Sequence, residues 1–476
     1  MSLEITEERQ LWNRVADIVV GHPRTLETHR VAPRLDPEKI RVLLAQCDFR
    51  QPMDPQAALE FVTAAMLEHQ VHVPHPRYFG LYNPAPAPMS IIADTLVAAF
   101  NPNMAAWSHS PFANEAEQHV IRALGERFGY PPGQAFGVFA SGGAEANHTA
   151  LLAALTNAFP EFLDRGLRAL PAQPVFYVSS ERHHSFLKAA RLCGLGNVAV
   201  RHIGVDARFQ LNVDELAATI ANDRQAGFAP FLIVATAGTT NAGVIDPIPA
   251  MRQLAQQHNV WFHVDAAWAG AVALLSELRT LLEGIEHADS ITFDAHKWLS
   301  VPMGAGLFLT RHRDILRTTF RTPNEYMPRE AAGMDVIDWY EHSMQWSRRL
   351  IGLKVFLTLL AAGWEGYTET IRHMVAMGNR LREKLQSGQW RILNDTPLPV
   401  VCFADATAAE NGRAARLQAI VQGVLDSGEA WISTTVLGGA QPAIRACITC
   451  FRTGPQDVDR LAEALNRARA ACEAAQ

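Results

Sequence analysis

The sequence lacks any apolar run long enough to cross a bilayer, which takes about 20 residues. Its most apolar stretch, residues 231–237, ends at Gly238. Clusters of lysine or arginine are also missing, and the 476 residues carry a net charge of -6 at pH 7. Nucleic acids and anionic membranes are recognised by concentrated positive charge. These absences predict a soluble chain that binds neither nucleic acid nor membrane and acts on small molecules.

A secretion signal and a disulfide framework are missing as well. Residues 1–8 include acidic side chains and have neither the basic start nor the apolar core of a signal peptide. The six cysteines are scattered through apolar segments, which suits reduced core thiols. Cys447 and Cys450 have the spacing of a redox or zinc pair, but no second pair or nearby histidine completes a metal site. We expect a cytoplasmic protein that holds no metal.

The composition is that of a folded protein with more than one core. Hydrophobic residues make up 48% of the sequence and charged residues 19%, and 476 residues exceed the size at which a single core stops growing. We predict an N-terminal helical arm (residues 1–75), a large domain (76–349) and a small C-terminal α/β domain (350–476). Prolines, glycine and polar residues predict a mobile loop at 317–348.

The arm contains two helical patterns, at residues 38–47 and 56–69. Each follows an Asp-Pro pair, in which the aspartate caps the helix and the proline suits its first turn. Two such helices are too small to form a core of their own. The arm is therefore expected to lie on another surface, for which a partner subunit is a fair candidate.

The large domain alternates short apolar runs with helical patterns. This alternation predicts strands joined by helical crossovers in a mostly parallel sheet that is flanked by helices, with ligands at the carboxyl ends of the strands. The clearest predicted strands are residues 175–178, 198–203, 231–236, 260–264 and 291–293. Beyond the loop, a helix at 350–361, three strands at 400–403, 430–436 and 443–451, and two helices at 414–425 and 458–471 make up the small domain.

Two motifs at predicted strand ends suggest covalent chemistry on a phosphorylated ligand. Lys297 follows the strand 291–293 in a turn beside His296, and a desolvated lysine amine there can condense with an aldehyde. Gly142, Gly143 and Ala144 precede a helical pattern, and a small-residue turn at a helix start can bind phosphate. Taken singly, a surface lysine and a plain glycine turn explain the same residues.

Three further strand ends carry polar residues. Asp265 ends the strand 260–264 before Ala266 and Ala267, where a buried acid needs a cationic partner, such as a protonated pyridine nitrogen or an arginine. His183 and His184 follow the strand 175–178, and a histidine there can stack on an aromatic ring or transfer protons. Thr240 follows the strand 231–236 and offers a hydroxyl. Together, these motifs would surround one cleft.

This combination resembles the pyridoxal-phosphate-dependent amino acid decarboxylases of the aromatic amino acid and glutamate decarboxylase group, which have fold type I. The resemblance runs from about residue 75 to 452. It implies an α/β fold, a homodimer with a shared active site, and decarboxylation of an L-amino acid to the amine and carbon dioxide. It also implies that pyridoxal phosphate forms a Schiff base with Lys297.

The resemblance assigns roles to individual residues. His184, chosen over His183 because a His-Ser pair matches the family pattern, would stack on the cofactor ring, and Asp265 would pair with its nitrogen. Thr240 would contact the ring hydroxyl and Ala267 would pack under the ring. The phosphate would be held by Gly142, Gly143 and Ala144, with His296 and Asp294 beside the lysine. The family often has asparagine at the position of Asp294, so a phosphate contact there is open.

The loop residue that protonates the product carbanion in this family is a tyrosine. An ungapped match places Trp339 at that position, and a shift of one residue places Tyr340 there, which is the candidate catalytic residue. With Trp339 in that role, an oxygen-dependent aldehyde synthase becomes the alternative activity. Aminotransfer is a third activity, and a cofactor-free regulatory protein is the non-enzymatic alternative.

The substrate is predicted from an aromatic segment at residues 78–86 and from residues 101–107. Candidate substrate contacts are Tyr78, Phe79, Pro84 and Trp107, which favour an aromatic or mid-sized apolar amino acid. Residues 101–107 resemble the glutamate decarboxylase version of this region. Leu81, however, stands where those enzymes carry an amide, so an acidic substrate such as glutamate remains the alternative.

Overall fold

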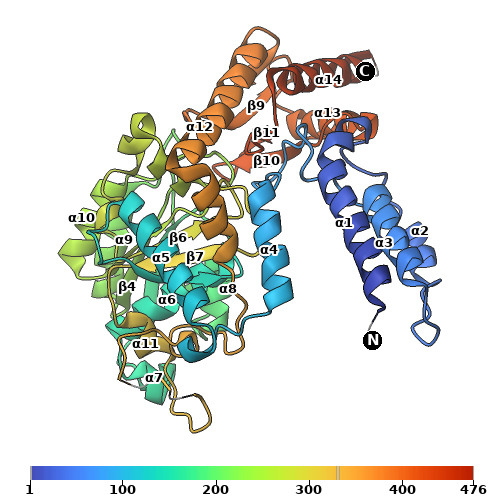
Figure 1. Ribbon diagram of the computed structural model, residues 1–476. Coiled ribbons are helices and arrows are strands. Elements are labelled where there is room, and N and C mark those ends of the chain that lie inside the picture. Colours follow the sequence, from blue (N-terminus) through green and yellow to red (C-terminus); the bar gives the residue numbers. More distant parts are fainter. Residues whose placement is uncertain (1–2, 329, 332, 475–476) are drawn as a thin grey trace.

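The structure is a computed structural model that describes residues 3–328, 330–331 and 333–474. Two sheets organise it, a seven-stranded one flanked by helices and a four-stranded one near the C-terminus (Figure 1). Three helices at the N-terminus extend beside the smaller sheet, away from the larger one (Figure 1).

The N-terminal arm consists of α1 (Ile5–Thr25), α2 (Pro37–Leu44) and α3 (Pro55–His69). The side chain of Asp36 accepts a hydrogen bond from Lys39 N at 3.0 Å, and Asp54 accepts one from Ala57 N at 2.9 Å. These two caps confirm the predicted starts of α2 and α3, whereas α1 had not been placed. All three helices lie within the described residues and none of their residues is buried.

The large sheet has the strand order β1-β7-β6-β5-β4-β2-β3. Its parallel pairs are β5 with β6, β4 with β5, β2 with β4 and β2 with β3, while β7 runs antiparallel to β1 and β6. The strands are β1 (Phe136–Ala140), β2 (Pro174–Ser179), β3 (Val200–Ile203), β4 (Ala229–Thr236), β5 (Trp261–Asp265), β6 (Ser290–Asp294) and β7 (Gly306–Thr310). The predicted mostly parallel sheet is confirmed.

Helices cover this sheet because its strands are apolar on both faces. Every residue of β2, β5, β6 and β7 is buried, as expected for a sheet between helix layers. The helices of this part are α4 (Pro88–Phe100), α5 (Pro111–Phe128), α6 (Gly143–Ala158), α7 (Phe162–Arg165), α8 (Ser185–Leu192), α9 (Val213–Gln225), α10 (Ile248–His258) and α11 (Ile315–Phe320). Helix α6 packs along the sheet with α8 beside it.

The small sheet is antiparallel, with the strand order β10-β11-β9-β8. Its elements are α12 (Leu353–Gln386), β8 (Trp390–Ile392), β9 (Val400–Asp405), α13 (Arg413–Ser427), β10 (Ser433–Leu437), β11 (Gln441–Cys447) and α14 (Pro455–Ala474). The helix predicted at 350–361 starts at Leu353 and, after a break at Gly363 with φ of 63°, continues to Gln386. Glycine permits this left-handed backbone without steric cost.

The segment after the arm joins the small sheet. Phe79 N donates to Trp431 O at 2.8 Å and Cys447 N donates to Phe79 O at 2.9 Å. Residues 78–79 therefore lie between Trp431 and the last residue of β11, so this segment contacts the small sheet just beyond the predicted boundary at residue 75. Among the described helices, none combines the length and the apolar character needed to cross a membrane.

Three histidines meet where the arm joins the body. The ring of His72 lies 5.9 Å from that of His22 and 5.7 Å from that of His29, measured between centroids. Burial lowers the pKa of His22, and the neighbouring His72 lowers it further. Burial also lowers the pKa of His72, whose Nδ1 finds no partner among the described residues. This junction therefore favours the neutral imidazoles of His22 and His72.

We expect low pH to destabilise the packing of the N-terminal arm at this junction. Because the pKa values of His22 and His72 lie below the unfolded value of about 6.5, the folded state binds fewer protons, and stability is lost as pH falls below about 6.5. Hydrogen-exchange protection factors of residues 5–25 should drop between pH 8 and pH 5.5, and less so in His72→Gln. His287→Gln, at an exposed histidine, is the control; protection independent of pH would contradict the prediction.

Candidate active site

One edge of the large sheet collects the ends of five strands. In the strand register, Gly306 of β7 pairs with both Ala140, the last residue of β1, and Asp294, the last residue of β6. A Cβ built on Gly306 would lie 2.4 Å from the carbonyl carbon of Gly142. Only glycine allows this approach. It places the turn after β1 beside the turn that carries Lys297.

Lys297 lies against an acid at this edge. Its Nζ is 2.9 Å from Asp294 Oδ2, with the lysine side chain 21% exposed and the aspartate 2%. His296 Nε2 is 3.9 Å from the same oxygen, and His296 Nδ1 accepts from Ala305 N at 3.1 Å. Burial lowers the pKa of His296, against the opposing effect of Asp294. The second oxygen of Asp294 is buried and finds no donor among the described residues.

Asp265, at the end of β5, is held by two donors. Ala267 N donates to its Oδ1 at 3.1 Å, and Asn147 Nδ2 donates to its Oδ2 at 2.8 Å. The residue is 4% exposed. No arginine or lysine of the described residues forms an ion pair with it, so the alternative of a core pair with arginine is not what the structure contains. A cation brought by a ligand would complete the site.

The glycine turn opens helix α6, as predicted. The 16-residue helix starts at Gly143, and Ala144 lies in its first turn. A Cβ on Gly143 would come within 2.7 Å of Asp294 Oδ2, so a larger residue would collide with the acid beside Lys297. Backbone N-H groups at a helix start favour an anion. The glycine cradle, the unpaired Asp265 and the lysine amine together fit the phosphate, ring nitrogen and aldehyde of pyridoxal phosphate.

Of the two histidines after β2, the structure brings His183 toward the site. The surrounding protein desolvates His183 and lowers its pKa; the charge of Asp265 raises it and that of Lys297 lowers it. His183 Nδ1 accepts from Ser185 N at 3.2 Å. His184 stands at the start of α8, and both histidines are exposed. The family pattern points to His184, and the electrostatic surroundings point to His183.

The loop after β4 joins the two sheets. Thr240 O accepts from Tyr82 Oη at 2.9 Å and from Arg445 Nη1 at 2.7 Å. The next residue, Asn241, donates to Glu181 at 3.1 Å and accepts from Thr435 Oγ1 of β10 at 2.8 Å. The position of Thr240 therefore depends on the small sheet.

Arg445 is a buried cation that the sequence analysis overlooked. It is 5% exposed, and its Nε finds no acceptor among the described residues. In the described part of the chain, no carboxylate lies within ion-pair distance of it. An arginine alone in the apolar run 443–451 was the available signal, because such a charge is costly to bury without a partner.

The candidate substrate residues do not gather in one place. Phe79 is fully buried in the core of the small sheet. Tyr78 is buried with its ring centroid 5.2 Å from that of Trp431, and Pro84 is buried too. Trp107 donates through its backbone to Asp338 at 2.7 Å and through its indole to Glu115 at 2.9 Å. Phe79 and Tyr78 thus serve packing of the small sheet in this structure.

Three aromatic rings form a row that ends at Trp298, the residue after Lys297. Tyr82 stacks on Trp268 with ring centroids 4.6 Å apart, and Trp268 lies 5.5 Å from Trp298, the residue after the lysine. Trp268 donates its indole N-H to Gly238 O at 2.7 Å, which holds the middle ring in place. All three rings are buried.

The two loop candidates differ in their surroundings. Trp339 is fully buried and lies under the guanidinium of Arg348, with the Arg348 Cζ 4.9 Å from the ring centroid. Tyr340 is 8% exposed, and its hydroxyl accepts from Asn324 Nδ2 at 3.3 Å. A third loop aromatic, Tyr326, which was not considered from the sequence, is 75% exposed. Its segment extends below α11, away from the body (Figure 1).

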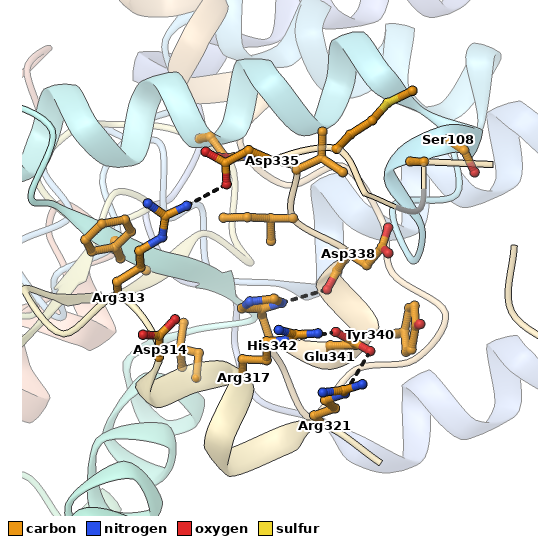
Figure 2. Close-up of a pocket in the computed structure, with 18 of the residues that line it drawn as sticks. Ser108, Arg313, Asp314, Arg317, Arg321, Asp335, Asp338, Tyr340, Glu341 and His342 are labelled. Atoms are coloured by element: carbon orange, nitrogen blue, oxygen red, sulfur yellow. Dashed lines mark hydrogen bonds and ion pairs between the residues drawn. The ribbon is translucent and has the colours of Figure 1, made fainter. Parts of the chain in front are cut away.

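A cavity of about 690 Å³ lies under this loop, lined by Tyr340 and by charged residues of α11 and the loop. Figure 2 shows Arg313 paired with Asp335 at 2.6 Å, and Glu341 paired with Arg317 at 3.0 Å and Arg321 at 3.4 Å. Lys297 is not among its lining residues. The arginines and acids of this cavity neutralise one another and fasten the loop to α11.

Comparison with known proteins shows the family of the chain. The conserved domain of pyridoxal-dependent decarboxylases matches residues 37–405. An L-2,4-diaminobutyrate decarboxylase of Rhizobium meliloti (strain 1021) is 33% identical over 86% of this chain and 81% of its own. An aromatic-L-amino-acid decarboxylase of Bacillus atrophaeus is 29% identical over 96% of this chain and 94% of its own. The crystal structure of mouse CSAD is 26% identical and superposes with a TM-score of 0.91 over 98% of this chain and 99% of its own.

The domain match spans more than half of the chain and includes the glycine turn, Asp265 and Lys297. The resemblance stated from the sequence is therefore confirmed, together with fold and cofactor. The chain belongs to the pyridoxal-dependent decarboxylase family and is a pyridoxal-phosphate-dependent amino acid decarboxylase.

Proposed function

We propose that the substrate is an L-amino acid with an aromatic or mid-sized apolar side chain, which leaves as the amine after loss of carbon dioxide. The observation that carries this proposal is the row of aromatic rings of Tyr82, Trp268 and Trp298, of which Trp298 is the residue next to Lys297 in the chain. Apolar side chains gain free energy from such surfaces, at about 25 cal/mol per Å² of apolar area removed from water. The Bacillus relative named above acts on aromatic amino acids by its name.

The residues at the sheet edge divide the chemistry between them. When bound, pyridoxal phosphate supplies an electron-withdrawing ring that accepts the electrons of the breaking Cα–carboxylate bond. Lys297 supplies the amine that holds the cofactor aldehyde, and Asp294 Oδ2 holds the Lys297 ammonium group at 2.9 Å before loading. Asp265 would hold a proton on the ring nitrogen, while the turn of Gly142, Gly143 and Ala144 would donate to the phosphate. Thr240 and Ala267 stay the proposed contacts of the ring.

Decarboxylation by this set of residues can be tested with products and one variant. The purified protein loaded with pyridoxal phosphate should convert an aromatic or apolar L-amino acid into an amine lighter by one carbon dioxide, detected by mass spectrometry. Lys297→Ala should abolish this turnover because no other amine takes its place. Lys188→Ala, at an exposed lysine on α8, should retain it. Near-normal turnover by Lys297→Ala would contradict the proposal.

An acidic substrate is the second candidate, and Arg445 favours it. A buried guanidinium with an unused Nε, beside the loop of Thr240, would pair with a carboxylate of the substrate. In the same panel of amino acids, turnover of glutamate or aspartate in place of the aromatic ones would establish this candidate. Formation of an aldehyde with peroxide and ammonia would instead establish the oxidative alternative.

The two histidines can be separated by single variants. We expect His183→Gln to lower kcat and to weaken cofactor binding more than His184→Gln, because His183 shares the electrostatic environment of Asp265 and Lys297. A histidine that transfers protons in catalysis contributes about 100-fold or more. Steady-state kinetics and titration of the apoprotein with pyridoxal phosphate measure the difference. A larger loss in His184→Gln would restore the residue chosen from the family pattern.

The role of Tyr326 and the oligomeric state of the chain are proposed together. The buried Trp339 and Tyr340 are held by packing and by Asn324, whereas Tyr326 is 75% exposed and its ring stacks only on that of Trp346 among the described residues, with the centroids 5.8 Å apart. The arm exposes apolar side chains along all three helices, including Trp12, Val42 and Val62, and such a surface suits burial in a subunit interface. The chain thus forms a homodimer in which Tyr326 of one subunit serves as proton donor in the active site of the other.

Mixed dimers test this sharing directly. Lys297→Ala and Tyr326→Phe subunits should each be inactive in amine formation. After joint refolding in equal amounts, half of the dimers are hybrids with one complete site out of two, so about one quarter of the activity should return. Mass photometry would verify the dimer. A loop that acts within its own subunit, or a monomeric protein, would give no recovery.

A further inference from the structure

Behind Asp265, a buried chain of polar side chains runs through the large sheet. Asn147 on α6 is 1% exposed, and its Nδ2 donates to Asp265 Oδ2 at 2.8 Å and to Ser185 Oγ at 2.9 Å. On its other side, Asn147 Oδ1 lies 3.3 Å from His263 Nε2. His263 is fully buried on β5, two residues before Asp265.

The series of hydrogen bonds continues on the other side of the His263 imidazole ring. His263 Nδ1 lies 2.8 Å from Ser290 Oγ, and Ser290 Oγ accepts from Trp261 Nε1 at 2.8 Å. Ser290 and Trp261 are both buried. Burial lowers the pKa of His263 to about 4, so at neutral pH the ring carries a single N-H.

The direction of every hydrogen bond follows from the acid at the end. A carboxylate oxygen only accepts, so the amide nitrogen of Asn147 faces Asp265, and its Oδ1 accepts from His263 Nε2-H. The unprotonated His263 Nδ1 then accepts from Ser290 Oγ-H, and Ser290 accepts from Trp261. From Trp261 through Ser290 and His263 to Asn147, each donor therefore points toward Asp265. Aligned hydrogen bonds polarise one another and stabilise negative charge at the end of the chain.

We propose that Asn147, backed by His263 and Ser290, is the positioning residue that orients Asp265 and keeps it an anionic partner for the cofactor ring nitrogen. This inference rests on the role proposed above for Asp265. Ala267 N holds one carboxylate oxygen and Asn147 the other, so the plane of the carboxylate is set before any ligand arrives. Asn147 acts only through Asp265. Its bond to Ser185 also ties the start of α8 to the same amide.

The test uses three variants of the full-length protein and two measurements. Asn147→Leu removes the donor, Asn147→Asp keeps the shape but places a like charge beside Asp265, and Ser290→Ala breaks the chain at its far end. Apoprotein is titrated with pyridoxal phosphate to obtain its Kd, and the absorbance of the bound cofactor is followed against pH. Asn114→Leu, at a fully buried asparagine of α5 bonded to Ser110 O, is the matched control.

Both Asn147 variants should bind pyridoxal phosphate about 10- to 100-fold more weakly. Their absorbance transition should move to higher pH, because a carboxylate that has lost a donor, or that faces a second carboxylate, holds the proton shared with the ring nitrogen more tightly. Ser290→Ala should show a smaller shift in the same direction, and Asn114→Leu should lower only the melting temperature. If Asn147→Leu does not fold, the isosteric Asn147→Asp carries the test.

The variant Asp265→Asn tests the role proposed for Asp265 separately from the role proposed for Asn147. A native Kd and absorbance profile in Asp265→Asn would overturn the role of Asp265 itself. Changes in Asp265→Asn combined with native behaviour in both Asn147 variants would overturn only the positioning role of Asn147. An equal change of Kd in Asn114→Leu would show general destabilisation and would also overturn it.

Discussion

The close approach of Gly306 to Gly142 is the constraint on which the site depends. Strand β7 runs between β1 and β6, and Gly306 pairs with the last residue of each. Any side chain at Gly306 would collide with the backbone of Gly142. Because this contact is so short, the first turn of α6 and the turn of Lys297 share one space, and the amine lies near the helix start that suits a phosphate.

Charge at this edge is arranged around two buried acids with different partners. Asp294 is paired with Lys297 and lies beside Gly143, whereas Asp265 has hydrogen-bond donors but no cationic partner among the residues that the structure describes. An unpaired buried carboxylate is costly, and a bound cation relieves that cost. The small sheet takes part as well, because Arg445 and Thr435 hold the loop of Thr240 and Asn241. Movement of one sheet against the other would therefore change the site.

Much of the site was predictable because its residues follow apolar strands. The carboxyl ends of parallel strands meet at one edge, so Asp265, Lys297 and the glycine turn could be brought together from their positions after apolar runs alone. The same reasoning could not choose between His183 and His184, because neighbouring residues after a strand face different directions. Nor could it find Asn147, whose importance comes from an acid 118 positions away in the chain.

In the loop and in the aromatic segment, local sequence patterns did not predict which aromatic side chains are exposed. Aromatic residues at 78–86 and 339–340 suggested a pocket, but Phe79 and Trp339 are fully buried in packing, while the exposed Tyr326 had no distinguishing pattern. Burial of one aromatic ring rather than another depends on which surfaces the fold brings together. The sequence by itself determined where the strands lie, in which order the motifs follow them, and that Lys297 stands after the strand 291–293. Only the tertiary structure decided which rings are exposed, which histidine faces the acid and how the hydrogen bonds behind Asp265 are directed, because each of these depends on contacts between residues distant in the chain.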